Sequence, residues 1–157
     1  MNPERFESVL QSPLGPLCIQ ADRQALRGVF LLPAGGAPRG EESALTRTAA
    51  LELAEYFEGR RRRFDLPLRL TGTEFQQRVW RILATLPYGG ATSYQAIAQR
   101  LGKPGAARAV GGAVGKNPFP ILLPCHRVLG REGALGGFRL GLDAKRRLLA
   151  LEGIGWK

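Results

Sequence analysis

Asn117-Pro118-Phe119-Pro120-Ile121-Leu122-Leu123-Pro124-Cys125-His126-Arg127-Val128 combines three prolines around an apolar run with an adjacent cysteine and histidine. Proline fixes φ and lacks an N–H donor, so we expect this segment to be extended and stiff. Cys125 is one of two cysteines, and His126 is the single histidine among 157 residues. A thiol presented beside an imidazole indicates nucleophilic chemistry. The alternative is a buried cysteine that only fills core space.

The side chains of Cys125 and His126 would point to opposite sides of an extended segment. Direct contact between thiol and imidazole would then be strained, so we expect a bridging water. Such a relay also needs a carboxylate that orients the imidazole. Glu152 is the candidate, because it lies in the last turn of a predicted helix, where a carboxylate opposes the helix dipole. The alternative is an exposed glutamate without a role.

Composition limits the classes of protein that the chain can represent. The net charge is +10, from 23 Lys+Arg against 13 Asp+Glu, which favours a polyanionic partner, with nucleic acid ahead of an acidic membrane surface. An arginine-rich proteome would produce the same excess. No apolar run approaches the ~18 residues of a membrane helix, and residues 1–10 contain no signal-peptide core, so we expect a soluble cytoplasmic protein. One histidine and two cysteines predict neither a metal site nor a disulfide framework. We expect no cofactor.

The N-terminal part predicts a small α+β unit with little visible chemistry. Residues 6–10, 17–21 and 26–31 are β-rich and are separated by turns, so a meander is expected over 4–33. Residues 41–58 predict a helix, and 64–68 predict a last short strand. The stripe that the helix buries is expected to be Leu45, Ala49, Leu53 and Phe57. We interpret Cys18 as core. The arginines at 60–63 either contact phosphate or form a solvated turn.

Residues 71–73 predict a boundary between two domains, 1–70 and 71–157. Thr73 and Gln76 resemble a capping box that opens a helix over 74–85, with Trp80 in the core. Thr92 or Ser93 caps a helix over 93–101, and a Gly-containing turn leads to a third helix over 105–115. Two short helices joined in this way predict a helix-turn-helix.

The third helix has an unusual outer face. Its inner stripe is expected to be Ala106, Ala109, Val110 and Ala113. The opposite stripe consists of Arg108, Gly111, Gly112 and Gly115. A helix that reads the major groove would carry longer polar side chains there. The bare face instead indicates close approach to a minor groove, with Arg108 as a probe into the base stack. The alternative is tight helix packing with a solvated Arg108.

Two further elements follow the Cys-His segment. Residues 130–141 form a glycine-rich loop of a kind that lines pockets. Asp143 is expected to cap a final helix over 144–152, with Ala144, Leu148 and Leu151 facing inward.

Taken together, the motifs of this chain resemble the O6-alkylguanine-DNA alkyltransferases, the methylated-DNA–protein-cysteine methyltransferases. The resemblance is dense over 71–153 and looser over 1–66. It is carried by residues 73–80, Pro87-Tyr88-Gly89, Ser93-Tyr94, residues 107–111, Asn117-Pro118, residues 124–128, and Lys145, Leu148-Leu149 and Glu152-Gly153. It implies an α+β fold, in which a ribonuclease-H-like N-terminal meander and helix accompany a mostly helical C-terminal domain.

The resemblance also implies the chemistry. Cys125 would accept an alkyl group from O6 of guanine, and possibly O4 of thymine, once and irreversibly. His126 would act as a water-mediated base, and Glu152 would orient it. Tyr94 would bind the guanine and crowd the neighbouring phosphate, and Asn117 would be a hinge between the recognition helix and the cysteine segment.

The implied partner is double-stranded DNA containing O6-alkylguanine, bound by a monomer through the minor groove without sequence preference. The implied DNA-binding residues are Tyr94, Ala106, Ala107, Arg108, Gly111 and Arg127, with Arg108 replacing a flipped base. The implied pocket residues are Pro120, Val128, Phe138, Arg139 and Leu140. The chain departs from the common family pattern over 138–140, and because Leu140 replaces a glycine we expect bulky adducts such as benzyl to react more slowly than methyl.

Two other classes of function stay open. One is a non-enzymatic sensor that flips and binds the alkylated base, against which the presence of Cys125 argues. The other is a DNA-binding regulator, against which the bare recognition face argues. A hydrolytic cysteine enzyme is weaker still, because no oxyanion-hole motif is visible.

Overall fold

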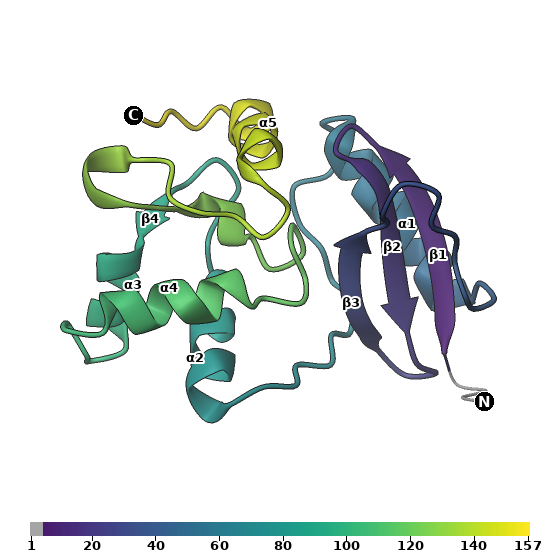
Figure 1. Cartoon of the computed structure of the whole chain (residues 1–157), viewed down its shortest axis with the longest axis horizontal. Coiled ribbons are helices and arrows are strands. Elements are labelled where there is room, and N and C mark those ends of the chain that lie inside the picture. Colours follow the sequence, from purple (N-terminus) through teal and green to yellow (C-terminus); the bar gives the residue numbers. More distant parts are fainter. Residues whose placement is uncertain (1–4) are drawn as a thin grey trace. The chain divides into compact units, whose positions relative to one another are not determined.

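The computed structural model describes residues 5–157 and divides the chain into two compact units, with the boundary between Leu70 and Thr71 (Figure 1). Each unit is described separately. In the described part of the chain, no helix is both long and apolar enough to cross a bilayer.

The N-terminal unit is built on an antiparallel meander in the order β1-β2-β3. Its strands are β1 (Phe6–Ser12), β2 (Gly15–Ala21) and β3 (Leu26–Leu31). The first turn is tight because Ser12 Oγ donates to the Gly15 carbonyl at 2.6 Å and Gly15 adopts φ +116°, a conformation that glycine tolerates. The predicted meander is therefore confirmed. Residues 64–68 make only one isolated bridge, between Leu68 and Leu26, rather than the expected fourth strand.

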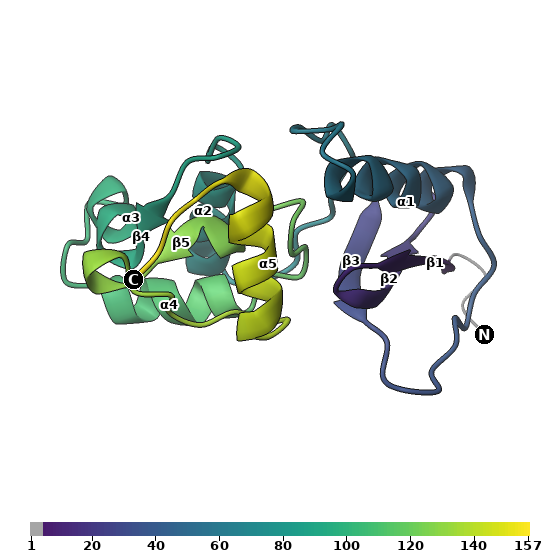
Figure 2. The same cartoon turned by 90° about the horizontal axis from the view of Figure 1, so that it is seen from above.

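Helix α1 (Ala44–Phe57) covers one face of this sheet (Figure 2). Ser43 caps the helix and forms a reciprocal capping box with Thr46. The side chains that it buries are Thr46, Ala49, Leu53 and Tyr56. Of the predicted buried stripe, Ala49 and Leu53 are confirmed, whereas Leu45 and Phe57 lie at the edge of the buried face and are half-buried. Thr46 can be buried since its hydroxyl accepts a hydrogen bond from Ser8 at 2.8 Å.

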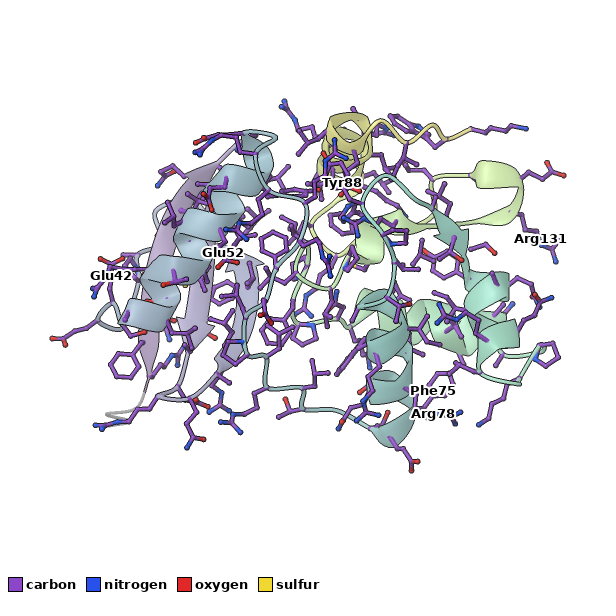
Figure 3. The ribbon with its side chains drawn as sticks, turned by 180° about the vertical axis from the view of Figure 1, so that it is seen from behind. Glu42, Glu52, Phe75, Arg78, Tyr88 and Arg131 are labelled. Atoms are coloured by element: carbon purple, nitrogen blue, oxygen red, sulfur yellow. The ribbon has the colours of Figure 1, made fainter. Side chains whose placement is uncertain are left out.

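The C-terminal unit begins with α2 (Glu74–Leu83), which has the expected capping box between Thr73 and Gln76. Trp80 is buried, as predicted, and its indole N–H donates to the Ala113 carbonyl at 2.9 Å. This bond joins α2 to α4 (Ala107–Gly115). Phe75 and Arg78, labelled in Figure 3, extend from α2 on the viewed side.

The predicted helix-turn-helix is formed by α3 (Tyr94–Arg100) and α4. Ser93 caps α3 by accepting from the Ala96 amide at 3.0 Å, and Gln95 Nε2 donates to the Pro104 carbonyl across the turn at 2.8 Å.

On α4 the buried residues are Val110, Ala113 and Val114. Ala109, predicted to face inward, is exposed, because the buried stripe of α4 runs through Val110, Ala113 and Val114 and leaves Ala109 on its outer side.

Residues 117–128 fold as a series of turns, so the expectation of an extended segment was wrong. Leu123 N donates to the Phe119 carbonyl at 2.8 Å, and Ile121 has φ +75°, a strained value for a β-branched residue. Cys125–Arg127 then form the 3-10 turn η1. The prolines limit φ, as expected, but φ near −65° suits turns as well as strands.

Two short strands tie this segment to the helix-turn-helix. Strand β4 (Thr92–Ser93) pairs in parallel with β5 (Val128–Leu129), which follows η1 directly. The 3-10 turn η2 (Arg131–Gly133) opens the glycine-rich loop. Helix α5 (Leu142–Glu152) follows, capped by Gly141 with φ +100°. The cap predicted at Asp143 was wrong, because Asp143 lies inside the first turn and pairs with Arg146 at 2.8 Å.

Candidate active site and nucleic-acid interface

Cys125 lines a cavity of about 340 Å³ in the C-terminal unit. Its side chain is buried, with 2% of the residue exposed. The cavity is lined by Tyr94, Gly111, Val114, Gly115, Cys125, Gly137, Phe138 and Arg139. Its volume is in the range of small-ligand pockets. Because α4 forms one wall, the helix that is predicted to contact DNA also borders the thiol.

The His126 side chain reaches Glu152 in the last turn of α5. Its Nε2 lies 2.6 Å from Glu152 Oε2, and both side chains are fully buried. An ionised carboxylate can only accept, so Nε2 carries the proton and Nδ1 has a free lone pair. Nδ1 is buried and has no hydrogen-bond partner among the described residues. The imidazole is therefore held in the tautomer that can accept a proton at Nδ1.

Glu152 is the centre of a buried polar cluster. Arg127 Nε and Nη2 donate to its two oxygens at 2.8 and 3.0 Å, and the Gly89 amide donates to Oε1 at 3.0 Å. Burial raises the pKa of Glu152, but the hydrogen bonds from His126 and Arg127 outweigh it and hold the pKa well below its usual value. The carboxylate is ionised at neutral pH, and Arg127 balances its charge.

Arg127 was expected on the DNA-binding surface, and the structure corrects this. Only 5% of the residue is exposed, and its Nη1 donates to the Leu86 carbonyl at 2.6 Å. Tyr88 lies beside α5 in Figure 3, and its hydroxyl donates to the Leu151 carbonyl. The Arg127 guanidinium lies 5.7 Å from the centroid of the Tyr88 ring. The guanidinium is thus committed to the interior, where pairing with Glu152 offsets the cost of burying a charge.

Burial raises the pKa of the Cys125 thiol to about 11. The Asn117 side chain and the positive charges of Lys145 and Arg139 oppose this rise without cancelling it. Burial also lowers the pKa of His126, so the imidazole is neutral. A neutral thiol beside a neutral base means that the reactive thiolate forms only as its proton leaves.

Asn117 links the end of α4 to the cysteine segment. It is fully buried; its Nδ2 donates to the Leu123 carbonyl at 2.8 Å, and its Oδ1 accepts from the Phe119 amide at 2.9 Å. These bonds use both ends of the amide and hold the turns that precede Cys125. The geometry suits the hinge that was expected.

Lys145 belongs to the residues that carry the resemblance, but it was not predicted as a site residue. It is fully buried, and Nζ donates to the Val128 carbonyl at 2.7 Å and to the Gly137 carbonyl at 2.9 Å. Burial lowers the pKa of Lys145 to about 8. One feature of the sequence indicated this burial: Lys145 lies three residues before Leu148, on the face of the predicted helix that was expected to point inward.

The expected pocket residues fall into two groups. Phe138 and Arg139 line the cavity, and the Phe138 ring contacts the His126 ring edge-on at 6.4 Å between centroids. Pro120 and Val128 are buried and Leu140 is half-buried, and these three are not part of the cavity lining. Tyr94 is half-buried in the wall, and burial raises the pKa of its hydroxyl.

The outer face of α4 is open. Arg108 is exposed, and a Cβ added at Gly112 or Gly115 would meet no atom within 4 Å in the described part of the chain. A Cβ at Gly111 would meet the Tyr94 ring at 3.7 Å, an ordinary contact. Helix packing therefore does not require glycine at these positions. Ala106 and Ala107 start the same helix and are half-buried.

Within residues 5–157, no group of three or more His, Cys, Asp and Glu side chains is arranged to hold a metal ion.

Comparison with known proteins agrees with this geometry. Residues 74–154 match the 6-O-methylguanine DNA methyltransferase, DNA binding domain, and residues 6–70 match the ribonuclease-like domain of the same proteins. The chain belongs to the methylated-DNA–protein-cysteine methyltransferase family.

Individual family members are similar over most of the chain. The methylated-DNA–protein-cysteine methyltransferase of Mycobacterium bovis is 44% identical over 147 residues, covering 91% of this chain and 89% of its own. That of Mycolicibacterium paratuberculosis is 56% identical over 104 residues, or 66% of this chain and 63% of its own. A crystal structure of Mycobacterium tuberculosis OGT in complex with DNA has a TM-score of 0.84 and 43% identity, covering 94% of this chain and 92% of that one. The expected family and α+β fold are confirmed.

The single histidine of this methyltransferase gives it a defined stability response to acid. Burial lowers the pKa of His126 in the folded chain. Below about pH 6.5 the imidazole of the unfolded chain therefore binds a proton, whereas that of the folded chain stays neutral. Glu152, whose pKa is lowered in the folded chain, adds a second loss of stability below about pH 4.5. We expect the free energy of unfolding to fall by ~1.4 kcal/mol per pH unit from His126 alone, starting near pH 6.5.

Urea unfolding from about pH 7.5 to about pH 5 measures this loss. The NMR resonance of the imidazole provides a second readout, because one histidine gives one signal. We expect that signal not to titrate in the folded protein until well below pH 6.5. Titration at the usual pKa, or a pH-independent unfolding free energy over this range, would contradict the assignment.

Proposed function

We propose that this chain repairs DNA by transferring an alkyl group, foremost methyl, from O6 of guanine to Cys125 in a single irreversible step. The observation that carries the proposal is Cys125 in the lining of a cavity bordered by α4, next to a histidine whose Nδ1 is buried and unpartnered. A base flipped out of the duplex could enter this cavity and place its O6 substituent on the sulfur.

The proposed step transfers one proton and one alkyl group. The Cys125 thiol proton passes through a bridging water to His126 Nδ1, and the sulfur attacks the alkyl carbon. The bond from that carbon to O6 breaks, its electron pair stays on the guanine, and the guanine takes up a proton. Tyr94, with its hydroxyl at the cavity wall, would hydrogen-bond the departing ring. The S–C bond has no built-in route of cleavage, so each molecule reacts once.

The exposed face of α4 supports a minor-groove interface without base readout. Apart from Arg108, the face carries open glycines, which have no side chain to hydrogen-bond base edges. The net charge of +10 supplies attraction to phosphate. Arg108 would fill the gap that the flipped base leaves. A monomer suffices, because the cavity and α4 come from the same unit.

A non-enzymatic sensor of alkylated bases is the second candidate. It would use the same cavity and helix, and a nucleophile would be unnecessary. The presence of Cys125 in the cavity lining argues against it, because a sensor does not need a thiol at that position.

Mass spectrometry after incubation with duplex DNA containing O6-methylguanine separates the candidates. We expect the peptide containing Cys125 to gain one methylene, the DNA to lose it, and the yield to stop at one equivalent. Cys125→Ala should bind the duplex and show no transfer, whereas Cys18→Ala should transfer normally, because Cys18 is the fully buried cysteine of the other unit. Binding by the wild-type protein without a mass change would support the sensor.

The α4 interface predicts a second result. Gly112→Leu places a long side chain where the protein leaves open space, so the fold should tolerate it and gain helix propensity. On DNA the same side chain would obstruct close approach, and we expect affinity to fall about tenfold, an overpacking cost of ~1.4 kcal/mol. Thr48→Leu places the same leucine side chain on the exposed side of α1 and should leave affinity unchanged. Equal affinities for both variants, measured by fluorescence anisotropy, would rule out contact at Gly112.

A further inference from the structure

Arg139 connects two walls of the cavity. It lies in the loop of residues 130–141, and its Nη1 is 3.1 Å from the Asn117 carbonyl and 3.3 Å from the Lys116 carbonyl. Lys116 is the C-cap of α4, and Asn117 is the next residue. Carbonyls at a helix C-terminus lack intrahelical partners and carry partial negative charge, so a guanidinium is a favourable partner.

The loop has other polar anchors near the cavity, and one is the Tyr94 hydroxyl of α3, which is hydrogen-bonded to the Gly137 backbone. Lys145 on α5 donates to the Gly137 carbonyl at 2.9 Å, two residues before Arg139. Between residues 130 and 141 the glycines at 133, 136 and 141 have positive φ, so the loop depends on residues without a Cβ for its path. Lys145 therefore pins the loop from α5, and Arg139 pins it from α4.

We propose that Arg139 is a positioning residue that latches the 130–141 loop to the end of α4 and thereby sets the size of alkyl group that can reach Cys125. This inference rests on the proposed alkyl transfer. The latch spans the wall that α4 and the loop form together, and both Arg139 and Cys125 border the same cavity.

The latch is weak enough to act as a selector. The Arg139 side chain is exposed, so water competes for its bonds to the two carbonyls. A methyl group passes with the latch closed, whereas a benzyl group requires the loop to move away from α4. Removing the guanidinium should therefore favour the bulky adduct.

Four proteins test this inference: wild type, Arg139→Met, Arg139→Lys and Arg131→Met. Arg131 is exposed in the same loop and extends away from it in Figure 3, so its replacement removes an equal charge and leaves the latch intact. The measured quantities are single-turnover rates on duplexes with O6-methylguanine and with O6-benzylguanine. Arg139→Met should raise the benzyl-to-methyl rate ratio about fivefold, the effect of ~1 kcal/mol.

Arg139→Lys should retain the wild-type ratio, because an ammonium can donate to both carbonyls from one nitrogen, as Nη1 does. Arg131→Met should also retain it. Amide hydrogen exchange over 136–141 should quicken in Arg139→Met alone, without a change in α5. An unchanged or lower ratio in Arg139→Met, or an equal rise in Arg131→Met, overturns the latch. If wild type transfers no methyl group, the proposed function fails, and the exchange rates still decide whether Arg139 holds the loop.

Discussion

Glu152→Gln should slow alkyl transfer about 100-fold or more while the protein stays folded. Glu152 Oε2 now accepts the proton of His126 Nε2 at 2.6 Å. A glutamine must also satisfy Arg127 Nε and the Gly89 amide, which both donate to Glu152 Oε1, and it gives up the bond from Arg127 Nη2 to Oε2. Its oxygen is therefore drawn to that side, and its NH₂ group faces His126.

An amide donor facing Nε2 reverses the tautomer of the imidazole. Nε2 becomes the acceptor, the proton moves to Nδ1, and the lone pair that would take the thiol proton disappears. Because the Cys125 thiol has a pKa of about 11, little thiolate forms without that base. The volume of the side chain hardly changes, so binding of the DNA should persist.

Single-turnover kinetics on O6-methylguanine duplex measure the effect, with circular dichroism to confirm folding. Glu132→Gln is the matched control, since Glu132 is an exposed acid in the same unit. A wild-type rate in Glu152→Gln would show that the carboxylate does not set the tautomer. Loss of DNA binding in that variant would place Glu152 in recognition instead of catalysis.

Arg127→Met should lower the free energy of unfolding by ~3–5 kcal/mol, the largest loss of stability that we expect from a single substitution in this chain. It leaves a fully buried Glu152 carboxylate without its cationic partner. It also removes the donor to the Leu86 carbonyl, which holds the segment after α2. The lowered pKa of Glu152 should rise, so the loss should be greater at pH 7 than near pH 4.

Arg108→Met is the contrasting variant. Arg108 is exposed on α4, so its loss should leave the unfolding free energy nearly unchanged and weaken binding to DNA. Urea unfolding and the salt dependence of DNA affinity together distinguish the two arginines. If Arg127→Met were as stable as wild type but bound DNA poorly, Arg127 would belong to the DNA interface after all.

Much of the architecture follows from local sequence. The meander, the capping boxes at Ser43 and Thr73, and the short helices around the Gly102–Gly105 turn depend on residues within a few positions of each other. Such preferences act between neighbours in the chain, so periodicity and cap chemistry reveal them. The bare face of α4 belongs to this group, because it is a property of one helix.

The centre of the site depended on tertiary structure. Residue types alone indicated that Cys125, His126 and Glu152 work together, but not that Arg127 turns inward to the same carboxylate. Proline restrained the backbone of residues 117–128 without choosing between strand and turns, and pairing of β5 with β4 and the bonds of Asn117 made that choice. The charge states of Cys125, His126 and Lys145 likewise arise from burial, which the sequence alone does not specify. The chain alone determined which groups carry the chemistry; packing around them determined which proton each one holds.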